Sequence, residues 1–89
     1  MTRQSWIIGA GSDCDIIVDE PTVSSRHCQL VKTPEGFLVK DLGSTNGTYV
    51  NGQQVRDSRR VSLSDSITLG THVPLPWPSD QLAAGGQSV

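Results

Sequence analysis

The chain has 89 residues, a net charge of −2 at pH 7 and two cysteines, which fits one domain with a small core. The weakly acidic balance, without runs of like charge, argues against nucleic acid or an anionic membrane as the main partner. No apolar stretch approaches the roughly 20 residues of a spanning helix, and no leader peptide is recognisable. We therefore expect a cytoplasmic protein, or a cytosolic domain of a larger one.

Short apolar runs bounded by Gly, Pro, Asn, Asp and Ser predict strands, and no twelve-residue window has helical periodicity. Cys28 and Leu30 share one face of their run, as do Phe37 and Val39 in the next, which favours antiparallel sheets around a core. The fold expected is an all-β sandwich or small barrel. In chain order, the runs are 6–8, 15–18, 27–32, 37–42, 48–50, 53–55, 61–63, 66–69 and 72–73.

Two Asn-Gly pairs, Asn46–Gly47 and Asn51–Gly52, favour tight hairpin turns because both residues of each pair tolerate positive φ. We expect the recognition surface of the protein to centre on residues 43–52, which contain both pairs.

The chain changes character after Gly70, where prolines at positions 74, 76 and 78 predict an extended segment. We divide the chain into a domain at 1–73 and an exit segment and tail at 74–89. The exit segment is expected to lay Leu75 or Trp77 over an open end of the core, and a docking motif for another domain is the alternative. Residues 79–86 carry the signals of one short helical turn.

Catalytic and metal-binding readings find little support. Cys14 and Cys28 stand among apolar residues, so we expect both to be buried and reduced. Their spacing with His27 and His72 matches no metal-binding motif. Ser24 lies close to His27, but no Gly-x-Ser-x-Gly turn and no helix accompany it. No enzyme, metal or cofactor is predicted.

An ordered series of motifs resembles the forkhead-associated (FHA) domain over roughly residues 7–70. The series comprises Ile8-Gly9, Cys14-Asp15-Ile16, Ser24-x-x-His27, the segment DLGSTNGTYVNG at 41–52, and Leu69-Gly70. The resemblance implies a twisted antiparallel β-sandwich whose loops at one end bind a phosphothreonine peptide, a signalling partner from a Ser/Thr kinase pathway.

The resemblance also implies which residues would contact that peptide. Ser24 and Thr45 would donate their hydroxyls to the phosphate, and Asn46 would bind the peptide backbone. Ser25 would lie near the peptide, and Thr22 would read the residue three positions beyond the phosphothreonine.

Other residues would support the loops. His27 would pin them from inside, and Asn51 would tie down the second turn. The full supporting set is Gly9, His27, Gly47, Asn51 and Gly52.

The chain departs from the family pattern at Ala10, where members carry an arginine that grips the phosphate. A charge-assisted hydrogen bond contributes about 1.5–3 kcal/mol, so its loss would weaken binding roughly 10- to 100-fold. Arg26 is the nearest basic residue that could compensate. The alternative is a degenerate FHA domain whose protein contacts or assembly role do not depend on phosphate.

A second departure is the short N-terminal region, since family members open with one or two strands before the Ile-Gly step. The sandwich would then lack an N-terminal edge strand, and a second copy could cover that edge as a homodimer.

Overall fold

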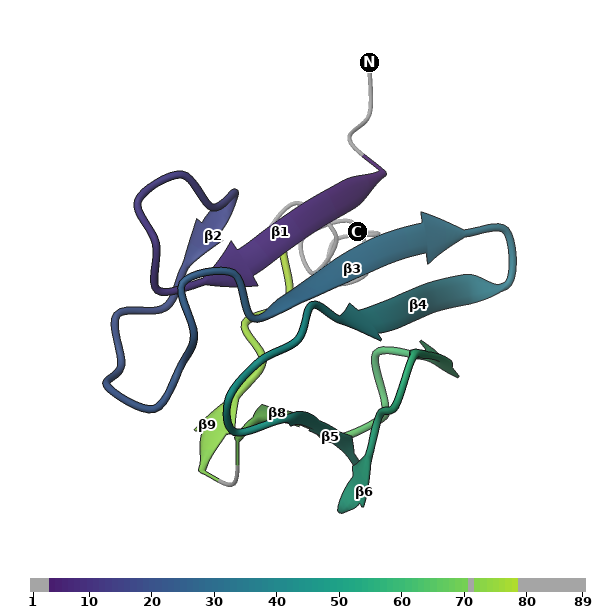
Figure 1. Cartoon of the computed structure of the whole chain (residues 1–89). Helices are drawn as coiled ribbons and strands as arrows, with labels where there is room; N and C mark the ends of the chain where they lie inside the picture. The colour runs from purple at the N-terminus through teal and green to yellow at the C-terminus, as the bar shows by residue number, and fades with distance from the viewer. Residues whose placement is uncertain (1–3, 71, 79–89) are drawn as a thin grey trace.

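The computed structural model describes residues 4–70 and 72–78, and these residues form a β-sandwich without helices (Figure 1). None of them belongs to a helix capable of crossing a membrane. The all-β prediction is confirmed. In chain order the strands are β1 (Ser5–Gly9), β2 (Ile16–Ile17), β3 (Cys28–Thr33), β4 (Gly36–Asp41), β5 (Thr48–Val50), β6 (Gln53–Gln54), β7 (Ser58–Val61), β8 (Ile67–Leu69) and β9 (Val73–Pro74).

The strands make two sheets, one ordered β2-β1-β3-β4-β7 and the other β6-β5-β8-β9. All pairs are antiparallel except β1 with β2, where Ile8 lies opposite Ile16 in a short parallel ladder. Among the described strands, β1 is therefore an inner strand, covered on its outer side by β2.

Strand β7 is where the predicted and observed elements differ most. The apolar pattern predicted a strand at 61–63, whereas the strand is Ser58–Val61. It lies at the edge of its sheet, and only Val61 is buried. Arg59 and Arg60 pair with β4 through backbone register, opposite Val39 and Leu38. Polar side chains on an edge strand give no apolar signal, which is why the run missed them.

Alternate side chains from both sheets fill the core. Cys28, Leu30 and Val39 have no exposed surface, and Phe37 is nearly as buried, so the two predicted inner faces are confirmed. The buried apolar residues are Trp6, Ile8, Cys14, Val23, Cys28, Leu30, Phe37, Val39, Val50, Val55, Val61, Ile67, Leu69 and Leu75.

The exit segment packs against this core. Leu75 is buried, and its N–H donates to the Ile67 carbonyl at 2.8 Å. The Trp77 ring meets Phe37 edge-on, with centroids 5.1 Å apart. The expectation that Leu75 or Trp77 covers the core is thus confirmed for both. The boundary after residue 73 stays a prediction, and the helical turn at 79–86 lies outside the described residues.

The two Asn-Gly pairs adopt different structures. Asn51 and Gly52 have φ of 52° and 86° and join β5 to β6 as a two-residue hairpin, as predicted. The hairpin prediction for Asn46–Gly47 is wrong, because Asn46 is not among the positive-φ residues and β4 and β5 belong to different sheets. The pairs flank β5 at opposite ends, and the recognition surface expected at residues 43–52 stays a prediction.

Candidate functional site

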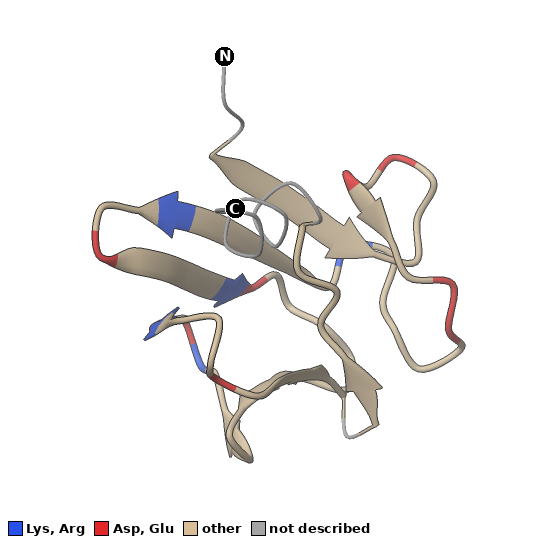
Figure 2. Cartoon of the chain, turned by 180° about the vertical axis from the view of Figure 1, so that it is seen from behind, with Lys and Arg blue, Asp and Glu red and all other residues tan. Residues whose placement is uncertain are grey.

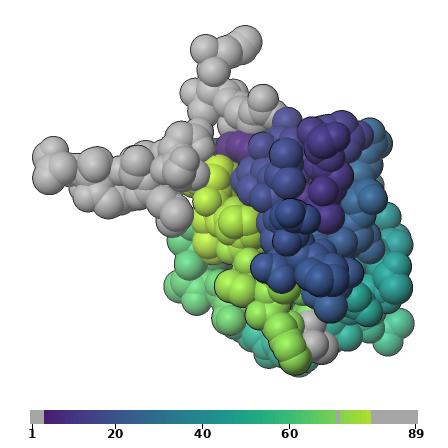
Figure 3. Space-filling model, turned by 90° about the vertical axis from the view of Figure 1, so that its left-hand side faces the viewer, coloured from purple at the N-terminus to yellow at the C-terminus, as the bar shows by residue number. Residues whose placement is uncertain are grey.

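Three loops gather at one end of the sandwich, and we call residues 10–15, 18–27 and 42–47 the apical loops. The first is held to the second by Ala10 N–H on the Ser24 carbonyl and Gly11 N–H on the Ser25 carbonyl, both at 2.9 Å. Figure 3 looks onto this end, where blue atoms of the first two loops adjoin the yellow-green C-terminal part.

Gly9 allows the first two loops to approach this closely. A Cβ on Gly9 would lie 2.3 Å from the Ser25 carbonyl oxygen, a distance that no side chain tolerates. The close contact therefore requires glycine at this position.

Ser24 and Thr45, predicted to share the phosphate, lie side by side. The Thr45 N–H donates to Ser24 Oγ at 3.0 Å. The Ser24 hydroxyl hydrogen is not consumed by that bond and can be donated to a ligand. Ser25 and Thr45 are both exposed. Two loops that are 21 residues apart in sequence thus present hydroxyl groups together.

His27 is fully buried beneath these hydroxyls. Its Nδ1 accepts from the Ser24 N–H at 3.1 Å, so Nε2 carries the hydrogen and donates to the Gly47 carbonyl at 2.7 Å. The ring therefore connects the second and third apical loops. With both nitrogens bound to backbone groups, His27 is not positioned as a base for the Ser24 hydroxyl.

Asn46 joins the third apical loop to the second, because its Nδ2 donates to the Thr22 carbonyl at 2.7 Å. Since Asn46 lacks positive φ, its backbone does not demand asparagine. The amide keeps one hydrogen and its carbonyl oxygen beyond this bond. Gly70 lies beside Asn46 and Thr22. Its N–H donates to the Gly47 carbonyl at 2.7 Å.

Asp41, which the motif contained but to which we gave no role, organises the third loop. Its carboxylate accepts from the Gly43 and Ser44 N–H groups and from the hydroxyls of Ser44 and Thr48, at 2.5–3.1 Å. Partial burial works to raise the pKa of Asp41, but these hydrogen bonds outweigh it and hold the pKa below its usual value. The Ser44 hydroxyl also accepts from the Gly47 N–H at 3.0 Å.

The Arg26 side chain is exposed, but it is held in an ion pair with Asp13. Its Nε and Nη2 both donate to Asp13 Oδ2, at 3.1 and 2.5 Å. Hydrogen bonding and charge from Arg26 lower the pKa of the Asp13 carboxyl and raise that of the guanidinium. The side chain of Ala10 is uncharged, and it packs against the core from a half-buried position. The pair of Asp13 and Arg26 gave no signal in the sequence, since the two residues stand 13 positions apart.

Asn51 and Gly52 lie outside this cluster. Asn51 Nδ2 donates to Asp65 Oδ1 at 3.1 Å, and the Ser66 N–H donates to Asn51 Oδ1 at 3.0 Å. The second turn is therefore tied to the loop before β8, at the end of β5 remote from Asn46.

Both cysteines are buried and free, as predicted. The Cys14 thiol donates to the Ser25 carbonyl at 2.9 Å and so supports the second apical loop. Burial, with the charge of Asp41 as a second cause, raises the pKa of Cys28 to about 12. The Cys28 thiol is therefore an inert core group.

The apical loops carry more acidic than basic side chains, with four acidic residues and one arginine. In Figure 2 the red acidic segments of the first two apical loops stand apart from the blue segments on β3 and β4. Within residues 4–70 and 72–78, no group of three or more His, Cys, Asp or Glu side chains is placed to hold a metal ion.

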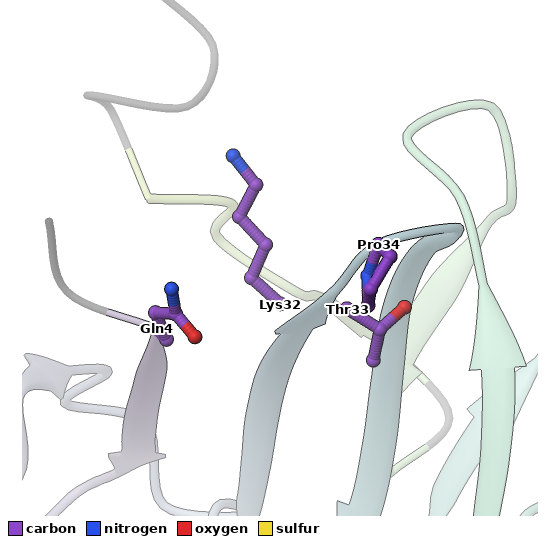
Figure 4. Close-up of a pocket in the computed structure, with 4 residues that line it drawn as sticks. All are labelled: Gln4, Lys32, Thr33 and Pro34. Atoms are coloured by element: carbon purple, nitrogen blue, oxygen red, sulfur yellow. The ribbon is translucent and has the colours of Figure 1, made fainter.

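A hollow of about 330 Å³ lies at the far end of the first sheet from the apical loops. Gln4, Lys32, Thr33 and Pro34 line it where β1 begins and β3 ends (Figure 4). It shares no residue with the loop cluster.

The sequence of this chain is similar to those of known proteins. The family model of the FHA domain matches residues 6–70. An oxoglutarate dehydrogenase inhibitor from Corynebacterium diphtheriae is 37% identical over 70 residues, which cover 79% of this chain and 48% of the relative. The chain therefore spans about half the length of that relative.

Solved structures agree with the sequence match. The second FHA domain of the Mycobacterium tuberculosis ABC transporter Rv1747 superposes with a TM-score of 0.70 at 35% identity, covering 88% of this chain and 70% of that one. The N-terminal FHA domain of Rad53p from S. cerevisiae, solved with a phosphothreonine peptide, gives a TM-score of 0.66 at 31% identity, covering 82% and 64%.

Proposed function

The chain belongs to the FHA domain family, and from that premise we propose that it is a protein-interaction module whose apical loops bind a phosphothreonine peptide with reduced affinity. The partner proposed is a protein phosphorylated by a Ser/Thr kinase. We propose no catalytic role and no cofactor. Buried free thiols fit a reducing compartment, so we place the module in the cytoplasm.

The observation that carries this proposal is the bond from the Thr45 N–H to Ser24 Oγ, which sets two hydroxyl-bearing residues of separate loops side by side. A phosphate brings about −1.5 to −2 charges and three strong acceptor oxygens. Hydroxyls on loops held by a rigid sandwich can satisfy those acceptors without large rearrangement.

The relatives give the proposal independent support. The Rad53p domain, similar to this chain in fold and at 31% identity, was solved with a phosphothreonine peptide. In this chain Asn46 stands next to Thr45 and is anchored through Thr22, which would position its amide beside a bound peptide.

Ala10 is the reason for expecting reduced affinity. No guanidinium comes from this position, and the remaining cation of the apical loops, Arg26, is already paired with Asp13. Hydroxyl donors alone lack the charge assistance and fork geometry that an arginine gives to phosphate.

Titration calorimetry with a phosphothreonine peptide library and its unphosphorylated counterpart tests the proposal. Phosphorylated members should bind, and the counterparts should not. Thr45→Val should weaken binding about tenfold, because it removes one donor to a charged acceptor. Thr33→Val, in the distant β3–β4 hairpin, is the matched control and should change nothing. Equal affinity for both peptide forms would refute phosphate recognition.

A second candidate function, binding of a partner without phosphate, is favoured by Ala10 and by the pairing of Arg26 with Asp13. Ala10→Arg separates the two. If the variant gains phosphopeptide binding that the native domain lacks entirely, the native domain is a phosphate-independent adaptor. If both bind and the variant is merely tighter, the phosphopeptide function stands.

A further inference from the structure

We propose that Asp13 occupies the Arg26 guanidinium in the free domain, and that a bound phosphate replaces the Asp13 carboxylate on that guanidinium. The inference rests on the proposed function and deepens it. It assigns the cation that stands in for the arginine missing at position 10, and it identifies the group that opposes binding.

The backbone places this ion pair within the apical loops. Gly11 N–H donates to the Ser25 carbonyl at 2.9 Å, which fixes the loop of Asp13 beside the loop of Arg26. Arg26 follows Ser24 by two residues, and Ser24 Oγ is bonded to the Thr45 N–H. A phosphate held by the Ser24 and Thr45 hydroxyls would therefore lie within reach of the long arginine side chain.

Arg26 is the one cationic side chain of the apical loops that can reach a ligand. These loops, all described by the structure, contain no lysine and no second arginine. His27 is buried, with both ring nitrogens bound to backbone groups. The other charged residues of the loops are acidic: Asp13, Asp15, Asp19 and Glu20.

The pair is built so that it can be exchanged. The side chains of Arg26 and Asp13 are 66% and 58% exposed, and pairs this exposed contribute little to stability. The Nε and Nη2 groups of Arg26 converge on a single carboxylate oxygen. The same fork fits a phosphate oxygen, and phosphate carries more charge than a carboxylate. The guanidinium therefore gains by the exchange, while Asp13 is released to water.

Asp13 is thus a positioning residue that sets affinity through Arg26. In the native domain, part of the attraction between Arg26 and phosphate is used to displace Asp13. This cost, added to the absence of an arginine at position 10, gives a module that responds only to high local concentrations of phosphorylated partner.

The test measures dissociation constants for the tightest phosphothreonine peptide of the library with Asp13→Asn and with Asp19→Asn. Both substitutions remove one negative charge from the apical loops, but only Asp13 forms the ion pair with Arg26. Asp13→Asn should tighten binding about two- to fivefold, the range that an exposed ion pair spans. Asp19→Asn should have a clearly smaller effect, set by long-range charge alone.

Arg26→Gln completes a double-mutant cycle. Alone, it should weaken binding about tenfold, because it removes a charge-assisted contact. In the Arg26→Gln background, Asp13→Asn should no longer improve affinity, since there is no guanidinium left to release.

Three results would overturn the inference: Asp13→Asn no tighter than Asp19→Asn, an undiminished gain in the Arg26→Gln background, or a loss of affinity in Asp13→Asn together with a lower urea midpoint. The last would show that the pair only holds the loops together. Failure of the proposed function looks different. If the native domain does not distinguish phosphorylated from unphosphorylated peptide but Asp13→Asn does, the exchange is supported and native recognition is not. No selectivity in either protein overturns both.

Discussion

His27, at the end of the second apical loop, and Asp41, at the end of β4, are two side chains that hold the apical loops in place. His27 links the Ser24 N–H to the Gly47 carbonyl from a fully buried position. Asp41 accepts three hydrogen bonds from the loop that follows β4 and a fourth from Thr48 of β5. Neither side chain needs to contact a ligand in order to fix the position of the loop residues that would bind it.

Asp41 should make the stability of the domain depend on pH. Its folded pKa lies below the usual value, so its stabilising contribution is present above the unfolded pKa of about 3.9 and is lost as pH falls through the folded value. Asp41→Asn should lower the free energy of unfolding by about 1–2 kcal/mol at pH 7. The difference from the native protein should shrink below about pH 4.

Urea denaturation at a series of pH values measures this difference. Asp57→Asn, which makes the same change of charge at an exposed position, is the control. A gap between native protein and Asp41→Asn that persists undiminished at pH 2–3 would show that the carboxylate does not act in this way.

The sequence allowed the site residues to be chosen by resemblance, but not the contacts that arrange them. Ser24, Thr45, Asn46 and His27 were all singled out and do lie in one cluster of loops. The pairing of Asp13 with Arg26 was missed, because an ion pair between exposed loops leaves no periodic pattern. Such contacts depend on how closely the loops approach one another in space, and the pattern of residues in one sequence does not reveal that distance.

At the scale of elements, the apolar runs located nearly every strand because a half-buried strand must alternate. They failed at β7, where an edge strand built from Ser58, Arg59 and Arg60 shows only Val61 to the core. The turn signal failed at Asn46–Gly47 for a different reason. The pair suits a hairpin, yet here the chain crosses between the two sheets, and only Gly47 takes a positive φ, of 85°.

The outer edge of β9 is poorly suited to pairing with another strand. Leu75 N–H and, by the register, Val73 face β8, so alternation turns Pro74 and Pro76 toward the side with no partner among the described strands. Neither proline has an N–H to donate. Prolines at such an edge protect it from strand addition. The homodimer expected from the short N-terminal region stays a prediction, and this edge does not favour it.

Replacing both prolines should create a usable edge. The double variant Pro74→Val, Pro76→Val restores two outward N–H donors, and sedimentation velocity should show stronger concentration-dependent self-association for it than for the native protein. Pro34→Val, in the exposed turn between β3 and β4, is the control for added apolar surface. If the double variant sediments like the control at all concentrations, the prolines do not guard this edge.

At the scale of the whole molecule, the sandwich places the apical loops, the hollow and the Asn51–Gly52 hairpin in different regions of its surface. The apical loops gather hydroxyl, amide and acidic groups at one end, while the hollow at Gln4 and Lys32 and the Asn51–Gly52 hairpin lie elsewhere. Ligand binding should therefore be confined to one end. Of the two Asn-Gly pairs, only Asn46–Gly47 lies in the apical loops, so we expect ligand contacts beside it, at Thr45 and Asn46, and none at Asn51–Gly52.

The most direct test of the central claim is an amide chemical-shift map of the labelled domain during titration with a phosphothreonine peptide. Shifts should concentrate at residues 22–26 and 45–47, grow with peptide concentration, and be absent with the unphosphorylated peptide. Residues 32–34 and 51–52 should stay unchanged. Shifts centred on those remote segments, or the same shifts with both peptide forms, would contradict phosphothreonine recognition by the apical loops.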